Sequence, residues 1–312
     1  MSWNSYYRGD GRPRDVTLAP PPPWRRLGGL EPHRAFLPPA GLTDAVNAAL
    51  YLHRPLLITG GAGTGKSTVI EQVAVELRLG PVLKWHVTSR STLPEALCRY
   101  DALAHIHALR VSEARGAAPA DIDAFLRLGP LGTALLPGRR PRALLIDEID
   151  KSDIDLPADL LDVLENGTFE IPELVRHTRD TVHVRTWEST GTAEIEAGLV
   201  QCDAFPFIVM TSNGERDFPA PFLRRCIRYD MPRPDAPALH RAVAAHLGLD
   251  GAPLAAEAAA LVTEFADRIA RGETLAVDQL LNAVRLVTDA GAPTGEQRRR
   301  LLDLMLRDLS GA

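Results

Sequence analysis

The stretch of residues 55–68, PLLITGGAGTGKST, constrains this chain more than any other. Its apolar start, residues 55–59, predicts a short buried strand, and the residues after Thr68 carry apolar side chains at helical spacing. Between them stands G-x-x-x-x-G-K-[ST], the signature of a loop that cradles phosphate groups, in the strand–loop–helix context that such a loop needs. A glycine-rich turn that matches by chance is disfavoured, because both flanking elements are present.

The residue types of this loop suit separate tasks. Glycines allow backbone conformations that side chains would block, so successive N–H groups can converge on phosphate oxygens. The positive end of the following helix adds to this attraction. Lys66 can reach the β and γ phosphates, and the Ser67 hydroxyl can hold Mg²⁺. The residues expected to contact the nucleotide are Gly60, Gly61, Ala62, Gly63, Thr64, Gly65, Lys66, Ser67 and Thr68.

A second motif follows an apolar strand predicted over residues 142–146. Asp147 at the strand end can hold Mg²⁺, usually through water, and Glu148 can orient the water that attacks the γ phosphate. A strand ending in solvated acids is the alternative, and it would be preferred if no phosphate loop preceded it. A further predicted strand, residues 205–210, leads to Asn213, whose polar side chain can help position the same water.

Length, charge and cysteine content exclude several classes of protein. A chain of 312 residues suits one large domain or two smaller ones. The net charge of −5 argues against a protein that coats nucleic acid. Cys98, Cys202 and Cys226 lie far apart without a C-x-x-C pair, which favours reduced thiols. The sequence shows no apolar run typical of a signal peptide or a membrane span, so we expect a cytoplasmic protein.

Periodicity and Gly/Pro punctuation predict the remaining elements. Residues 1–39 form a Pro/Arg-rich arm, either a disordered tail or a strap over the nucleotide pocket or a neighbouring subunit. Further strands are predicted over 81–87 and 226–231, with short ones at 169–172 and 181–185. Helices are predicted over 40–53, from the loop to about 79, 91–115, 117–127, 156–166, 236–247, 254–271, 275–290 and 295–309. The helix over 91–115 is expected to carry one apolar stripe: Leu93, Leu97, Tyr100, Leu103, Ile106 and Leu109.

The order of these motifs, phosphate loop, Asp-Glu strand, strand-tip Asn and then Arg before a helical tail, resembles the AAA+ ATPases. Within that superfamily the stretches YDAL (100–103), GPL (129–131) and LLDVLENGTFEIPEL (160–174) are similar to the MoxR-like branch. The resemblance covers roughly residues 40–290. It implies a P-loop NTPase α/β fold: a three-layer αβα core with a five-stranded parallel sheet over 40–233, an insertion at about 168–204, and an α-helical lid over 234–312.

The resemblance also implies residue roles. Lys66 and Ser67 match the loop's lysine and serine, Asp147 and Glu148 match the Mg²⁺ and catalytic acids, and Asn213 matches the first sensor. Arg225 matches the arginine finger that reaches the γ phosphate in a neighbouring subunit, and Arg224 is the adjacent candidate; an exposed basic pair is the alternative. The family's second-sensor arginine has no match, because residues 274–281 contain no basic side chain.

We therefore expect an ATPase with ATP and Mg²⁺ as cofactors, with ATP between the α/β core and the helical lid. The family expectation is a hexameric ring that remodels a protein client in a chaperone-like way, often with a von Willebrand A-domain partner. The alternative is a nucleic-acid-stimulated motor or a nucleotide-gated regulatory switch. The insertion mixes basic and acidic residues and forms no clear nucleic-acid strip, which favours protein partners. A small-molecule kinase would leave Asn213, the arginine pair and the lid unexplained.

Overall fold

The structure is a computed structural model that describes residues 6–7, 9–17, 20–22, 36–119, 121–188, 190–249, 254–289, 291 and 293–308. Much of the predicted N-terminal arm lies outside the described residues. The chain divides into two compact units. We call residues 40–59 with 69–230 the sheet unit, and residues 1–39, 60–68 and 231–312 the helical unit. No helix among the described residues is long and apolar enough to cross a membrane.

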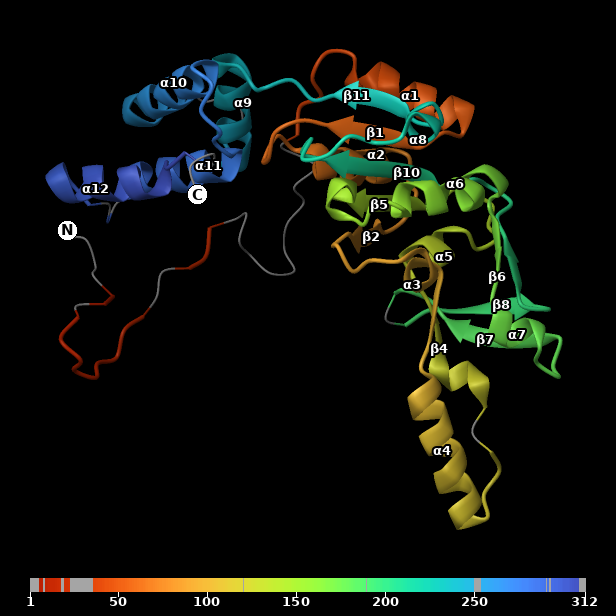
Figure 1. Ribbon diagram of the computed structural model, residues 1–312. Coiled ribbons are helices and arrows are strands. Elements are labelled where there is room, and N and C mark those ends of the chain that lie inside the picture. Colours follow the sequence, from red (N-terminus) through yellow and green to blue (C-terminus); the bar gives the residue numbers. More distant parts are fainter. Residues whose placement is uncertain are drawn as a thin grey trace. The chain divides into compact units, whose positions relative to one another are not determined.

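The sheet unit is built on a five-stranded sheet in the order β11-β1-β10-β5-β2, with every neighbouring pair parallel (Figure 1). Its strands are β1 (Leu56–Thr59), β2 (Leu83–His86), β5 (Ala143–Asp147), β10 (Phe207–Ser212) and β11 (Ile227–Asp230). The central strands β1, β10 and β5 are apolar and buried almost throughout, as expected of strands covered on both faces. The predicted α/β fold with a five-stranded parallel sheet is therefore confirmed.

Helices flank this sheet. They are α1 (Leu42–Leu52), α2 (Lys66–Glu76), α3 (Leu93–Leu97), α5 (Pro130–Ala134), α6 (Leu156–Asn166) and α8 (Ala220–Leu223), with a 3-10 turn η4 (Ile149–Lys151) directly after β5. Of these, α1, α2 and α6 lie where helices were predicted, whereas α5 and α8 were not predicted. Helix α6 shows why they pack: Leu156, Leu160 and Val163 recur on one face and are all buried. This burial holds the helices against the sheet and fixes the strand ends.

A second sheet of six strands lies in the same unit, in the order β3-β4-β7-β8-β9-β6. Its strands are β3 (Cys98–Tyr100), β4 (Leu126–Leu128), β6 (Thr168–Glu170), β7 (Thr181–Arg185), β8 (Thr192–Glu196) and β9 (Leu199–Gln201), and helix α7 (Pro172–Val175) follows β6. Strand β7 alternates exposed and buried residues, which is typical of a sheet with one solvated face. The two short strands predicted near 169 and 181 are present as β6 and β7.

Two helix predictions between residues 91 and 127 were wrong. The single helix predicted over 91–115 is instead α3, strand β3 and α4 (Ala102–Arg115). The helix predicted over 117–127 is a 3-10 turn η3 (Ile122–Phe125) followed by β4. Strands β3 and β4 pair antiparallel, Cys98 with Leu128 and Tyr100 with Leu126. The hydrogen bonds between these two strands, which are distant in the chain, outweigh the helical periodicity of the local sequence.

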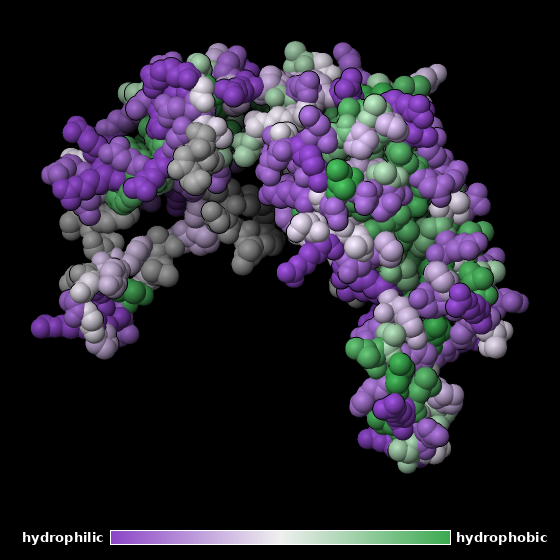
Figure 2. Space-filling view, in the orientation of Figure 1, coloured by the Kyte–Doolittle hydropathy of each residue, from purple (hydrophilic) through white to green (hydrophobic). Residues whose placement is uncertain are grey.

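Helix α4 also departs from the predicted apolar stripe. It begins at Ala102 because the side chain of Asp101 accepts a hydrogen bond from the N–H of Ala104 and caps the helix. None of its residues is buried, and Leu103 is 81% exposed. Figure 2 shows hydrophobic surface among the hydrophilic residues of this helix. Leu103, Ile106 and Leu109 are therefore surface residues and do not continue a core face.

The helical unit contains the four predicted C-terminal helices, α9 (Ala236–His246), α10 (Ala256–Ala270), α11 (Val277–Thr288) and α12 (Gly295–Met305). They enclose a core of their own, in which Leu239, Val262, Phe265 and Val284 are all fully or almost fully buried. Helix α9 is capped by the Asp235 side chain, which accepts from the N–H of Ala238.

Candidate functional site

The predicted phosphate loop belongs to the helical unit and needs its glycines. Gly60, Gly63 and Gly65 all have positive φ, at 142°, 71° and 86°. A Cβ added at Gly63 would lie 2.8 Å from the Cβ of Ala276 and 3.0 Å from the backbone nitrogen of Val277. Both the left-handed backbone and this close approach exclude larger residues at position 63.

Lys66 is folded into this loop. Its side chain is 7% exposed, and its Nζ donates hydrogen bonds to the carbonyl oxygens of Gly60 at 2.7 Å and Gly61 at 2.8 Å. Helix α2 begins at Lys66, so the loop ends at a helix N-terminus, where backbone N–H groups have no intrahelical partner. The amine is thus held inside the loop by two backbone carbonyl oxygens.

The paired carboxylates lie in the sheet unit, at the carboxyl edge of the parallel sheet. Asp147 is the last residue of β5, and Glu148 follows it in the left-handed region with φ of 58°. The buried hydroxyl of Thr211 links them: it donates to Asp147 Oδ1 at 2.7 Å and accepts from the Glu148 N–H at 2.9 Å. Both acids are therefore held by the neighbouring strand β10.

Asn213 comes to the same place. Its Nδ2 donates to Glu148 Oε1 at 3.4 Å, and its backbone N–H donates to Asp150 Oδ2 at 2.8 Å. The N–H of Glu215 donates to the same Asp150 oxygen at 3.1 Å. Asp150 is 4% exposed, so a buried carboxylate fixes the segment that carries Asn213. The structure thus brings together three of the predicted site residues, Asp147, Glu148 and Asn213.

Sequence reasoning missed two nitrogen-bearing side chains beside Glu148, those of Lys151 and His86. Lys151 Nζ donates to Glu148 Oε2 at 2.9 Å, and this hydrogen bond raises the pKa of Lys151. His86, the last residue of β2, has its Nε2 at 3.6 Å from Glu148 Oε2 and its Nδ1 at 3.7 Å from Asp147 Oδ2. A signal was present: His86 ends a strand of the parallel sheet, and all strand ends of one direction meet at one edge.

The donors suit Mg²⁺ better than a softer metal. Among the described residues there is no group of three or more His, Cys, Asp and Glu side chains arranged to hold a metal ion. A Mg²⁺ ion commonly binds one or two protein oxygens and completes its shell with water and phosphate oxygens. The carboxylate of Asp147 and the hydroxyl of Ser67 are oxygen donors of the kind that such sparse ligation uses.

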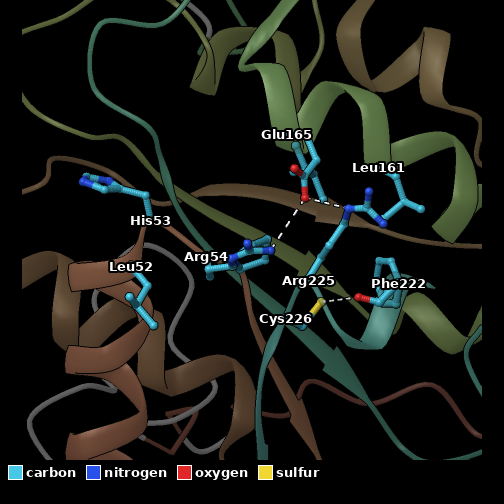
Figure 3. Close-up of a pocket in the computed structure, with 10 residues that line it drawn as sticks. Leu52, His53, Arg54, Leu161, Glu165, Phe222, Arg225 and Cys226 are labelled. Carbon is cyan, nitrogen blue, oxygen red and sulfur yellow. Dashed lines mark hydrogen bonds and ion pairs between the residues drawn. The ribbon is translucent and has the colours of Figure 1, made fainter. Parts of the chain in front are cut away.

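The candidate arginine finger lies elsewhere. Arg225 and Arg54, which lie side by side with Glu165 in Figure 3, stand just before strands β11 and β1. They are therefore at the amino edge of the parallel sheet, and Asp147 ends β5 at the opposite edge. Arg225 Nε donates to Glu165 Oε1 at 2.6 Å, its Nη1 donates to the carbonyl oxygen of Pro221, and Arg54 Nη1 lies 3.6 Å from the same Glu165 oxygen. The adjacent Arg224 is exposed. Within one chain, neither Arg225 nor Arg224 joins the carboxylates.

Comparisons with known proteins give structural likeness alone. No family model matches the chain, and no curated protein matches it. Among solved structures it is similar to domain III of the Thermotoga maritima replication initiation protein DnaA, with 16% identity, a TM-score of 0.42, and coverage of 86% of this chain and 94% of that one. It is also similar to NtrX from Brucella abortus in complex with ATP, with 17% identity, a TM-score of 0.42, and coverage of 88% and 57%. At such low identity and structural agreement, these likenesses show nothing about activity, ligand or assembly.

Proposed function

We propose that this chain is an ATP-binding and ATP-hydrolysing AAA+ protein of the MoxR type. One observation carries the proposal: Asp147, Glu148 and Asn213 converge at the carboxyl edge of the sheet, where β1 also ends. Thr59, the last residue of β1, pairs with Ser212, and the chain then enters the phosphate loop at Gly60. Acids and a polar amide are the groups that hydrolysis of a nucleotide triphosphate held by that loop would need.

The loop would hold the triphosphate. Phosphate oxygens would replace the carbonyl oxygens of Gly60 and Gly61 as partners of the Lys66 amine, because a dianionic acceptor binds an ammonium more strongly than a neutral carbonyl. Ser67 and Asp147 would hold Mg²⁺. When bound, that ion supplies charge that neutralises the β and γ phosphates during transfer.

Glu148 is the group proposed to orient the attacking water and accept its proton. The nearby Lys151 and Asn213 hold the carboxylate in place through its two oxygens, at 2.9 and 3.4 Å. A carboxylate that is fixed on both oxygens loses little freedom when the water arrives, which is the kind of preorganisation that lowers a barrier.

Arg225 is proposed to complete the site of the next subunit in a hexameric ring, with Arg224 as its exposed neighbour. Its position at the amino edge supports action between chains, because it lies away from its own chain's carboxylates. To act there, Arg225 must exchange its bond with Glu165 for one to phosphate. Arg54 stays beside Glu165 and keeps that carboxylate paired.

The proposed work is remodelling or activation of a protein client in the cytoplasm, with a von Willebrand A-domain protein as the partner class. The proposed organisation is a core over residues 40–233 with an insertion at about 168–204, and a helical lid over 234–312. Hydrolysis would change the grip of the lid and the core on the client.

The test is ATP turnover per subunit, measured against protein concentration for wild type, Glu148→Gln and Arg225→Ala. We expect the wild-type rate to rise with concentration and both variants to be inactive. Mixing the two variants should restore part of the activity, because each supplies the group that the other lacks. Arg228→Ala, an exposed arginine on β11, is the matched control and should retain wild-type turnover.

Nucleotide binding is measured on the same samples. Full activity of Arg225→Ala at all concentrations would refute a site shared between chains. Binding of ATP without turnover in any assembled state would instead identify a nucleotide-gated switch. Failure of wild type to bind ATP would overturn the proposal as a whole.

A further inference from the structure

A cavity of about 150 Å³ lies at the amino edge of the parallel sheet, within the sheet unit. Its walls come from the end of α1, from α6 and α8, and from the residues that lead into β1 and β11 (Figure 3). The proposed hydrolytic carboxylates stand at the carboxyl edge. The cavity therefore lies apart from those carboxylates, but it shares Arg225 with the proposed hydrolytic site.

The rim of the cavity carries unbalanced charge. Arg54, Arg225 and Glu165 all line it, so two guanidinium groups share one carboxylate and one positive charge is in excess. Arg225 is well satisfied, because it donates both to Glu165 and to the carbonyl oxygen of Pro221. Arg54 has a single ion pair at 3.6 Å, and its side chain makes no hydrogen bond to any described residue. Its donors remain available to an anion.

The floor of the cavity is apolar and neutral. Phe222 is 0% exposed, and Pro55 and Leu164 are also buried. The remaining polar group there is the thiol of Cys226, which donates to the carbonyl oxygen of Phe222 at 3.4 Å. Burial raises the pKa of this thiol to about 12, so it adds no negative charge at neutral pH. The cavity thus joins a cationic rim to an apolar base.

We propose that this cavity binds a carboxylate group carried on a short apolar stem. The volume corresponds to about five water molecules at about 30 Å³ each, which fits a small acid or one side chain. It is smaller than the roughly 300 Å³ at which pockets for drug-sized ligands begin, so it favours a small group over a whole nucleotide. One negative charge balances the excess of one positive charge, whereas a dianion would exceed it.

A carboxylate group of this kind can come from two sources. One is a free monocarboxylic acid, and the other is an Asp or Glu side chain of a second copy of this chain. Tyr51 and Leu52, at the end of α1, are exposed apolar side chains, and Leu52 lines the cavity. Exposed Tyr and Arg together are typical of protein contact surfaces, so both sources are tested.

The first experiment titrates the full chain with propionate and benzoate, followed by ligand-observed NMR and thermal shift. We expect binding in the millimolar range, as for other ligands of few atoms. Arg54→Gln should weaken it about tenfold, because a charge-assisted hydrogen bond is lost. Arg110→Gln, an exposed arginine on α4, is the matched control and should bind as wild type does.

The second variant, Glu165→Gln, should change the affinity for the acid in the opposite direction. Glu165→Gln raises the excess charge from one to two, so it should strengthen binding of propionate and admit the dianion succinate. Equal loss of affinity in Arg54→Gln and Glu165→Gln would overturn the proposal, because a merely damaged cavity would behave in that way. Absence of acid binding to wild type would overturn it as well.

Sedimentation velocity then separates the two sources. If propionate and Arg54→Gln both dissociate a self-associated wild type, the occupant is a side chain of a second copy. If propionate binds while self-association is unchanged, the occupant is a free acid. Turnover of ATP is not a readout in these assays, so failure here is distinguishable from failure of the proposed ATPase.

Discussion

At the scale of single residues, Thr211 has the most demanding position in the candidate site. One hydroxyl must donate to Asp147 and accept from the Glu148 N–H, and it does so from a buried position on the next strand. A hydroxyl is the smallest side-chain group that can do both at once. The register of β10 against β5 thus determines the orientation of both acids.

Thr211→Val should reduce ATP turnover by about 10- to 100-fold while ATP binding persists. The variant keeps the shape of the side chain but loses a charge-assisted bond worth about 1.5–3 kcal/mol, which converts to this range of rates. Phosphate release and nucleotide binding are measured in parallel. Thr211→Ser, which keeps the hydroxyl, is the control. Unchanged turnover in Thr211→Val would contradict the positioning role.

Asp150→Ala should destabilise the fold by about 2–3 kcal/mol in urea denaturation. The variant leaves the N–H groups of Asn213 and Glu215 without their buried acceptor. Asp150→Asn should cost clearly less, because its amide oxygen can still accept from both groups. Equal stability of wild type and Asp150→Ala would show that the buried carboxylate does not hold this segment.

At the scale of elements, the parallel sheet was predictable, and so was the edge that carries the candidate site. The central strands β1, β5 and β10 are apolar runs of ordinary length, and the motif residues Asp147 and Asn213 end or directly follow two of them. Parallel strands place these ends together, so the cluster follows from the sequence order. The partners His86 and Lys151 were missed because no motif marks them, and only the strand order β5-β2 brings His86 beside the acids.

The second sheet was not predictable to the same degree. Residues 98–100 and most of 126–128 fall within segments that were predicted to be helical, and they form strands because they pair with each other. Such pairing joins segments far apart in the chain, which a local pattern cannot reveal. The apolar stripe of α4 led to a wrong prediction for a similar reason. Leu103, Ile106 and Leu109 do recur at helical spacing, but no element of the described chain covers them.

The crossing of α3 and α5 has a strict steric requirement. A Cβ at Gly132 would lie 1.9 Å from the carbonyl oxygen of Leu97, a backbone atom that cannot rotate away as the end of a side chain could. Gly132→Ala should therefore destabilise the chain by about 2–3 kcal/mol in chemical denaturation. Gly138→Ala is the matched control, since its nearest contact would be 3.7 Å away, and it should be close to neutral. An unchanged stability of Gly132→Ala would contradict such close packing of α3 against α5.

At the scale of the whole molecule, the phosphate loop packs with the helical unit. A Cβ at Gly63 would meet Ala276 and Val277, and one at Gly65 would meet the ring of Phe36. A ligand held by the loop should therefore stabilise the folded helical unit as well as occupy a site. The chain divides into two compact units, so unfolding can be followed for more than one transition.

ATP at about 100 times its dissociation constant should stabilise the folded chain by about 2.7 kcal/mol, a rise in melting temperature of roughly 5 °C. Differential scanning calorimetry measures the rise. Lys66→Ala should abolish it, whereas Lys84→Ala, which removes a surface ion pair with Glu71, should retain it. A shift that survives in Lys66→Ala would mean that ATP binds elsewhere.

The bonds that Lys66 makes with Gly60 and Gly61 bear on the end of the proposed catalytic cycle as well as its start. When a phosphate group leaves, the amine returns to two acceptors that stand ready in its own loop. The departing product therefore leaves no unsatisfied buried cation behind, and its release costs less than it would from a loop without those carbonyls. A nucleotide site built in this way would favour release of the product over its retention, and so repeated turnover.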